Sequence, residues 1–127
     1  LIPKTIKNIL HNEKIVIHNN GSQTRDWIHV FDHSSAILSI LNKGQNNEIY
    51  NVSANQEFSN LEVVQDICNA MNSGHNLISF IEKENSNNRR SLNSTKICNL
   101  GWKPSFKFKH GLIETVRWYD NNQWFIR

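Results

Sequence analysis

The residues best suited to chemistry in this chain are cationic and amide side chains that can hold an anion. Arg25 lies just before a predicted extended segment, and its planar guanidinium can donate paired, charge-assisted hydrogen bonds to phosphate oxygens at any working pH. Asn60 stands at the predicted start of a helix, where its amide and the first free N–H groups could face the same anion. Each also has an ordinary structural interpretation, a salt bridge to Asp26 for Arg25 and a helix N-cap for Asn60.

Length and composition limit what else the chain can do. Its 127 residues suffice for one compact core, and 38% of them are hydrophobic. The net charge of +3 and the pI near 9.0 fit a phosphate-bearing small ligand as well as nucleic acid. The basic residues are spread out, however, and no nucleic-acid-binding motif accompanies them. We therefore expect one domain, or a piece of one, with no nucleic-acid partner.

The cysteines and histidines give no sign of a metal site. Cys68 and Cys98 form no C-x-x-C pair, and the six histidines are scattered except for His29 and His33, which we place across a strand-to-helix junction. No stretch approaches the roughly 20 apolar residues that span a bilayer. We expect no bound metal, no membrane span, and reduced thiols in a cytoplasmic protein.

Apolar spacing and turn signals predict the elements that must position these side chains. In chain order they are a helix over residues 2–12, a strand over 15–17, a turn at 19–21, an extended segment over 27–30, a helix ending at Gly44, a strand over 48–52, a helix opening at residue 59, a strand over 77–81, a polar loop over 82–90, and helices over 94–100 and 109–122. Asp32 is expected to cap the second helix, and Gly44 to end it in the left-handed conformation. Ser59 and Glu62 have the spacing of a capping box. The frequent asparagine pairs are assigned to turns, and the fold class is α/β.

Seven short motifs, in order along the chain, together resemble one protein family. The most specific is R-D-W-I-H-V-F-D-H at residues 25–33, which is similar to R-D-W-[IL]-x-V-x-D-H. The others are L-I-P at 1–3, I-H-N-N-G at 17–21, E-I-Y-N-V at 48–52, N-L-E-V-V at 60–64, K-I-C-N-L-G-W-K-P at 96–104, and the closing helix at 111–119. The series resembles the extended short-chain dehydrogenases that act on nucleotide sugars, nearest to the nucleoside-diphosphate-glucose (dTDP or UDP) 4,6-dehydratases.

This resemblance implies that residues 1–127 form the C-terminal portion of such an enzyme. The portion would comprise the last strand and helix elements of the Rossmann fold and a small α/β substrate-binding domain. The implied ligand is a nucleoside-diphosphate sugar, the implied cofactor of the full-length enzyme is NAD, and the implied assembly is a homodimer. The implied reaction oxidises the sugar at C4, eliminates water across C5 and C6 and returns the hydride. Its product is the 4-keto-6-deoxy sugar nucleotide of deoxysugar biosynthesis, for example toward rhamnose.

The resemblance also gives roles to particular residues. Arg25 and Asn60 match family positions that bind the diphosphate. Leu1 and His18 match positions that line the region of the base and sugar, with His18 replacing what is often tyrosine. For His18 an ordinary turn histidine in contact with water is an equal alternative.

The polar loop departs from the family pattern D-R-P-x-x-D-x-R-Y. Lys83 or Glu84 stands where the first arginine of that pattern grips the pyrophosphate, and neither is a bidentate donor. Losing one such contact costs about 1.5–3 kcal/mol of binding. Arg89 or Arg90 can supply the missing guanidinium, so Lys83, Arg89 and Arg90 complete the substrate-binding candidates.

The sequence lacks the motifs that would bind NAD and carry out the chemistry. It has no Gly-rich turn between a strand and a helix, and neither Tyr50 nor Tyr119 has a lysine four residues on. We therefore assign no catalytic or cofactor-binding residue to the segment, and expect the true start to lie upstream of Leu1. The alternatives are a non-catalytic nucleotide-sugar-binding module, or an epimerase or decarboxylase of the same family.

Overall fold

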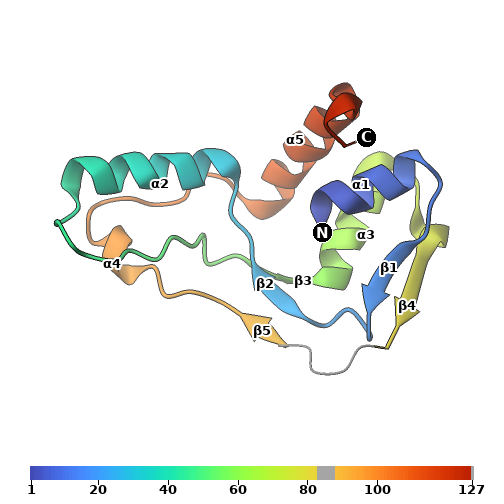
Figure 1. Cartoon of the computed structure of the whole chain (residues 1–127), viewed down its shortest axis with the longest axis horizontal. Helices are drawn as coiled ribbons and strands as arrows, with labels where there is room; N and C mark the ends of the chain where they lie inside the picture. The colour runs from blue at the N-terminus through green and yellow to red at the C-terminus, as the bar shows by residue number, and fades with distance from the viewer. Residues whose placement is uncertain (83–87, 127) are drawn as a thin grey trace.

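The computed structural model describes residues 1–82 and 88–126, which combine helices and short strands (Figure 1). The elements are α1 (Ile2–Leu10), β1 (Ile15–His18), β2 (Thr24–Asp26), α2 (Val30–Lys43), β3 (Glu57–Ser59), α3 (Asn60–Met71), η1 (His75–Leu77), β4 (Ile78–Ile81), β5 (Arg89–Arg90), α4 (Thr95–Cys98), α5 (Phe108–Asn121) and η2 (Gln123–Ile126). The predicted α/β class is confirmed.

The strands form two small sheets. β1 and β4 pair in parallel, with Ile15 opposite Ile78 and His18 opposite Ile81. In the second sheet β2 lies in the middle, antiparallel to β3 and parallel to β5. No strand in the described part of the chain exceeds four residues. Sheets this small are not stable alone, so they depend on the helices packed against them.

The main core lies where α1, α3 and α5 pack together beside β1 (Figure 1). In β1 the side chains alternate, so that Ile15 and Ile17 point into the core while Val16 and His18 point out. The buried members of this core are Ile6, Ile9, Ile15, Ile17, Val63, Val64, Ile67, Cys68, Phe108, Leu112, Val116 and Ile126. The helices thereby hold β1, whose carboxyl end carries the cavity described below.

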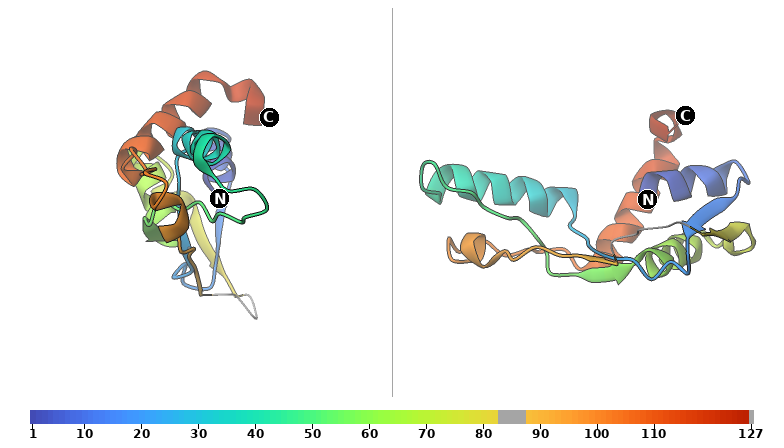
Figure 2. Two further views of the ribbon diagram at one scale, coloured as in Figure 1. Left: turned by 90° about the vertical axis from the view of Figure 1, so that its left-hand side faces the viewer. Right: turned by 60° about the horizontal axis from the view of Figure 1, so that its bottom comes forward.

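A smaller second core lies under α2. Figure 2 shows α2 extending away from the main body as an arm, with the coil after it and α4 along one side. Ala36 of α2, Ile97 of α4 and Trp102 are buried together there, and Tyr50 and Val52 of the coil pack against them. The Trp102 indole N–H also donates to the Ser35 hydroxyl at 2.9 Å.

Asp32 joins the arm to the chain that leads into α5. Its carboxylate accepts hydrogen bonds from the Ser105 N–H at 2.9 Å, the Ser105 hydroxyl at 2.7 Å and the Phe106 N–H at 3.0 Å. The prediction that Asp32 caps α2 is therefore wrong. The N-cap is His29, whose Nδ1 accepts from the Phe31 N–H, and Asp32 lies within the first turn, 2% exposed.

Two of the predicted strands are wrong in place or kind. The segment over residues 48–52 has no regular structure, and Ile49 is 83% exposed. The segment contains residues that favour strands, Ile49, Tyr50 and Val52, but the partner of β2 on that side is β3, further along the chain. The segment predicted over residues 27–30 is replaced by β2, three residues earlier, because α2 already begins at Val30.

The ends of the helices follow the sequence signals in part. The capping box is confirmed, since the Ser59 hydroxyl accepts from the Glu62 N–H at 3.2 Å and the Glu62 carboxylate accepts from the Ser59 N–H at 2.8 Å. Gly44 does follow α2, but its φ of −71° is extended, so the predicted left-handed cap is wrong there. The left-handed cap occurs instead at Asn72, which ends α3 with a φ of 49°.

We expect Asp32→Ala to lower the free energy of unfolding by about 2–4 kcal/mol, because two N–H groups and a hydroxyl would lose a charged acceptor in a buried place. Denaturant unfolding would measure the loss. Asp120→Asn removes a carboxylate from the exposed surface of α5 and should change stability by no more than about 0.5 kcal/mol. Equal losses in the two variants would contradict the role of Asp32.

The same carboxylate makes the joint sensitive to acid. Burial opposes its ionisation, but the hydrogen bonds from Ser105 and Phe106 favour it more, so the pKa of Asp32 lies below its ordinary value of 3.8. Since the folded-state pKa is lowered, the stabilisation is complete above the unfolded pKa and disappears as the pH falls through the folded value. The stability difference between wild type and Asp32→Ala should therefore shrink below about pH 4. A difference that stayed constant would contradict this assignment.

Candidate functional site

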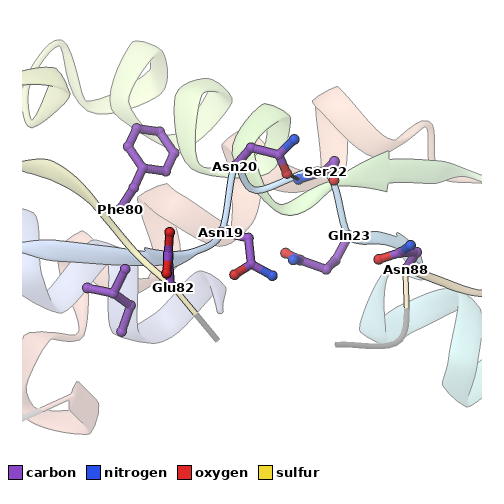
Figure 3. A pocket seen from close by; sticks show the side chains of 8 residues that line it. Asn19, Asn20, Ser22, Gln23, Phe80, Glu82 and Asn88 are labelled. Carbon is purple, nitrogen blue, oxygen red and sulfur yellow. Dashed lines mark hydrogen bonds between the residues drawn. The ribbon is translucent and has the colours of Figure 1, made fainter. Parts of the chain in front are cut away.

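A cavity opens where the parallel strands β1 and β4 end (Figure 3). It has a volume of about 810 Å³, and its lining comes from the turn after β1, the segment entering β2, the end of β4 and the residue before β5. These residues are Asn19, Asn20, Ser22, Gln23, Phe80, Ile81, Glu82 and Asn88. Ligands of α/β proteins bind beyond the carboxyl ends of parallel strands. The position of the cavity therefore favours a binding site.

The lining of this cavity suits a neutral hydrogen-bonding group. Four of the eight lining residues carry amides, which both donate and accept, and one, Glu82, carries a carboxylate. No lysine or arginine occurs among the described lining residues. The sequence pattern alone assigns the asparagines to turns and misses them as site residues. Asn19 and Asn20 directly follow a predicted strand, and this position could have indicated a binding site, because ligands bind at the carboxyl ends of strands.

Gly21 fixes the turn of the cavity against α3. Its φ is +74°, and a Cβ at this position would lie 2.8 Å from the Leu61 Cβ and 2.9 Å from the Ile17 Cγ2. The Leu61 N–H donates to the Gly21 carbonyl at 3.1 Å. Both the backbone conformation and the close approach therefore require glycine.

The start of α3 uses its N–H groups within the protein. The Asn60 N–H donates to the Gln23 carbonyl at 3.0 Å, the Leu61 N–H to Gly21, and the Glu62 N–H to Ser59. The expectation that free N–H groups of this helix face an anion is therefore wrong, and the N-cap is Ser59 rather than Asn60. The Asn60 side chain lies beside the cavity, since its amide donates to the Gln23 side chain at 3.4 Å. Its role toward a ligand stays a prediction.

Arg25 occupies the middle of β2, with β3 and β5 on either side. One of its guanidinium nitrogens, Nη1, donates to the Thr24 carbonyl at 2.7 Å. Neighbouring strand residues point to opposite faces, and the Asp26 carboxylate accepts from the Ser53 hydroxyl and the Gln56 N–H. Arg25 therefore projects from a strand that is paired along both edges, so its backbone is fixed and its side chain starts from a defined position for binding.

Arg89 belongs to a strand and an ion pair. The end of the predicted polar loop is β5, and the Arg89 guanidinium donates to both carboxylate oxygens of Glu57, at 2.7 and 2.6 Å. The hydrogen bond from Arg89, with a second from Ser91, lowers the pKa of Glu57 to about 2. Two N–H groups of Arg89 thus bind Glu57 of β3, whereas Arg90 is exposed on the same strand.

The remaining predicted residues are less informative. His18 ends β1 with an exposed side chain beside the cavity turn, and Leu1 precedes α1. Lys83 lies outside the described residues. Within residues 1–82 and 88–126, no group of three or more His, Cys, Asp or Glu side chains could hold a metal ion. In the same ranges, no helix has the length and apolar character needed to cross a membrane.

The sequence did not predict an apolar groove of about 570 Å³ where α1, α5 and residues 27–31 meet. Inside it His29 stacks on Phe106, with ring centroids 4.0 Å apart. Its main aromatic and aliphatic lining residues are Ile2, Trp27, Ile28, Val30, Phe31, Phe106, Phe108, Leu112, Trp118, Tyr119 and Phe125. Trp27 is two residues from Arg25, so the groove begins where β2 ends.

The sequence and the fold both have known relatives. A sequence model of the NAD dependent epimerase/dehydratase family matches residues 1–53. The dTDP-glucose 4,6-dehydratase of Xanthomonas campestris pv. campestris (strain ATCC 33913) is 35% identical over the whole chain, which covers 39% of that protein.

Solved structures agree with the sequence relatives. The dTDP-glucose 4,6-dehydratase of Bacillus anthracis, in complex with NAD, superposes with a TM-score of 0.89 at 37% identity, over 97% of this chain and 40% of that one. The enzyme DesIV of Streptomyces venezuelae, a dTDP-glucose 4,6-dehydratase with NAD and the ligand TYD bound, gives a TM-score of 0.91 at 29% identity, over 98% and 39%. The chain therefore spans about two fifths of the length of the relatives it matches. The resemblance is confirmed: the chain is similar along its whole length to dTDP-glucose 4,6-dehydratases, and over residues 1–53 to the NAD dependent epimerase/dehydratase family.

We expect Gly21→Ala to destabilise the protein more than Gly101→Ala. Both glycines have positive φ, which costs an alanine about 1–2 kcal/mol. Only at Gly21 does the new methyl group also meet side chains at less than 3.0 Å, whereas at Gly101 the nearest atom is the Lys43 Nζ at 3.7 Å. Denaturant unfolding of both variants would measure the difference, and equal losses would contradict the close packing of the cavity turn on α3.

Proposed function

We propose that this chain is the substrate-binding portion of an NAD-dependent nucleoside-diphosphate-glucose 4,6-dehydratase, a lyase that forms the 4-keto-6-deoxy sugar nucleotide. The observation that carries the proposal is the amide-lined cavity at the carboxyl ends of β1 and β4, beside the strand that holds Arg25. The similarity to dTDP-glucose 4,6-dehydratases along the whole chain supports it.

The parts of a nucleotide sugar would be divided among these features. The diphosphate carries two negative charges, and Arg25 would hold it with charge-assisted hydrogen bonds from a strand fixed on both sides. The amides of the cavity would bind a neutral group, since base and sugar both donate and accept hydrogen bonds. Asn60 would add an amide at the edge of the cavity, and Leu1 and His18 would flank the base and sugar. In this way the chain binds and orients the substrate and performs no chemical step.

The cofactor would be held elsewhere in the longer protein. After β1 the described chain makes the turn at residues 19–21 and continues into β2, so this strand leads to no helix whose N-terminus could face a dinucleotide phosphate. β2 and β3 do lead into the helices α2 and α3, but neither junction contains the glycines of a dinucleotide-binding turn. Hydride transfer would therefore fall to the part of the longer protein that this chain does not span. As further parts of the proposal we include a homodimer, a cytoplasmic location and a place in deoxysugar biosynthesis such as rhamnose formation.

An exposed apolar row on α2 supports a covering segment in the longer protein. Leu41 is 75% exposed and Leu38 is 60% exposed, on the side of α2 away from Ala36 and the second core. Val30, Phe31 and Ile37 continue the row at helical spacing and are exposed as well. A helix that is apolar on two faces is normally buried on both. We therefore expect the part not spanned here to pack on this row.

We expect the chain to bind dTDP-glucose or UDP-glucose, and Arg25→Ala to weaken that binding about 10- to 100-fold. The factor corresponds to the loss of a hydrogen-bonded charge, about 1.5–3 kcal/mol. Isothermal titration of the full chain would measure both dissociation constants, and Arg117→Ala, an exposed arginine on α5, is the matched control. Binding that is absent, or equal in Arg25→Ala and wild type, would refute the proposal.

The row on α2 gives a second test. We expect Leu38→Glu and Leu41→Glu to change the stability of the isolated chain by less than about 0.5 kcal/mol, because both side chains are exposed. When the chain replaces its matching part in the Bacillus anthracis enzyme, the same changes should cost about 2 kcal/mol or more each, because they bury a charge. Asn69→Glu, at an exposed position of α3, controls for added charge. Equal effects in both settings would show that nothing covers α2.

A further inference from the structure

The turn after β1 contains the only Asn-Gly pair of the sequence, Asn20-Gly21. Asparagine is thermolabile, because the nitrogen of the following peptide bond can attack the carbon of its side-chain amide. The attack meets least hindrance when the following residue is glycine, which has no Cβ beside that nitrogen. Every other asparagine of the chain precedes a residue with a side chain. Asn20 is therefore the asparagine whose sequence neighbour best permits this reaction.

We propose that Asn20 is a site of spontaneous deamidation, which converts the neutral turn of the cavity into an acidic one. In the first step the Gly21 nitrogen gives its proton to solvent and bonds to the Asn20 Cγ, while the Asn20 Nδ2 takes up a proton and leaves as ammonia. In the second step water opens the resulting succinimide ring, at one carbonyl to give aspartate or at the other to give isoaspartate. The reaction consumes water, releases ammonia and is independent of the proposed function.

The structure holds the Asn20 side chain in a suitable place for this reaction. Asn20 is exposed, so water and hydroxide reach it. Its Oδ1 accepts a hydrogen bond from the Ser22 N–H at 3.1 Å (Figure 3). This bond closes a ring that spans Gly21, and it keeps the side chain beside the peptide bond that carries the attacking nitrogen. The same N–H would stabilise the negative charge that forms on Oδ1 during the attack, as donors do in an oxyanion hole.

One hydrogen bond of the turn opposes the reaction. The Gly21 N–H donates to the His18 carbonyl at 3.1 Å, and the nitrogen can attack only while this bond is open. Asn20 and Ser22 on either side of Gly21 are exposed. Such a turn opens locally at a lower free energy than the whole protein unfolds. The fold therefore slows the attack without preventing it.

The packing of the turn requires the same glycine that makes Asn20 reactive. Gly21 has a φ of +74°, and a Cβ there would lie 2.8 Å from the Leu61 Cβ of α3. A larger residue at this position would shield the attacking nitrogen, but the backbone conformation and α3 exclude it. The reactive pair is thus a consequence of how the cavity turn is built.

Both products would change the cavity. Asn20 and Glu82 belong to the same lining, so a carboxylate at residue 20 adds a second negative charge where no described lining residue is a cation. In isoaspartate the main chain also runs through the side chain, and is longer by a methylene group. The turn could then no longer present Gly21 to Leu61 as before, so we expect the isoaspartyl form to unfold at a lower temperature than the aspartyl form.

The test follows deamidation residue by residue, with mass spectrometry of peptides from the full chain kept at physiological temperature. Asn72 is the internal comparator, because it is exposed and the N–H of the next residue, Ser73, is also bonded, to the Cys68 carbonyl at 3.1 Å. Asn20 should deamidate several times faster than Asn72. Its rate should rise with pH, because the Gly21 nitrogen must lose its proton. Asn20 that reacts no faster than Asn72 would overturn the proposal.

Two substitutions at Ser22 test the contribution of its N–H. Ser22→Pro removes this donor and should slow the deamidation of Asn20 severalfold, whereas Ser22→Ala keeps the donor and should leave the rate unchanged. Thermal unfolding of each variant shows whether it remains folded during the incubation. Equal rates in Ser22→Pro and Ser22→Ala would overturn the role assigned to this N–H.

Isoelectric focusing of the intact chain gives an independent readout. The incubated wild type should acquire a more acidic form that focuses with Asn20→Asp. Asn20→Gln should acquire that form much more slowly, since its longer side chain cannot close the same ring. An acidic form that appears equally fast in Asn20→Gln would show that another residue is modified, and would overturn the proposal.

Discussion

The proposed binding face depends on the backbone hydrogen bonds that hold β2 between β3 and β5. β2 has only three residues, yet it sends Arg25 to one face and Asp26 to the other. On one side Asp26 ties the strand to the coil through Ser53 and Gln56. On the other side Gln23, just before the strand, lines the cavity, and Trp27, just after it, lines the groove. If β2 moved by one residue, every one of these side chains would change faces.

Local signals gave good predictions for the helices. The capping box at Ser59 and Glu62 and the apolar spacing of α1, α3 and α5 each act within a few residues. The structure has α1 and α5 within two residues of their predicted ends, and α3 begins one residue after its predicted start. The strands were harder because their pairing is set by distant residues. The segment over residues 48–52 contains Ile49, Tyr50 and Val52, which favour strands, but β2 pairs with residues 57–59 instead. Likewise, nothing near Asp32 in the sequence indicates that its partners are Ser105 and Phe106.

The candidate site likewise contains residues that the sequence could identify and others that depend on distant parts of the chain. Arg25 could be singled out only with the help of the resemblance, because its residue type alone fits a surface salt bridge as well as a phosphate contact. The commitment of Arg89 to Glu57 could not, because it requires knowing that β3 and β5 lie on the two sides of β2. The cavity amides belong to residues that are common in turns generally. Their common position around one cavity follows only when β1 and β4 are known to end at the same edge.

The separation of the two cores has a consequence for how the chain unfolds. Among the described residues the main core contains twelve buried residues and the core under α2 contains three. Asp32 and hydrogen bonds of the coil, such as those of Ser53 and Gln56, join the arm to the rest of the chain. Elements with little buried apolar surface open at lower free energy than the rest of a protein. Opening of the arm would leave the strands and the cavity intact. Cooperativity in this chain is thus limited, and an arm of low intrinsic stability would become ordered most fully once a covering segment packs on its exposed apolar row.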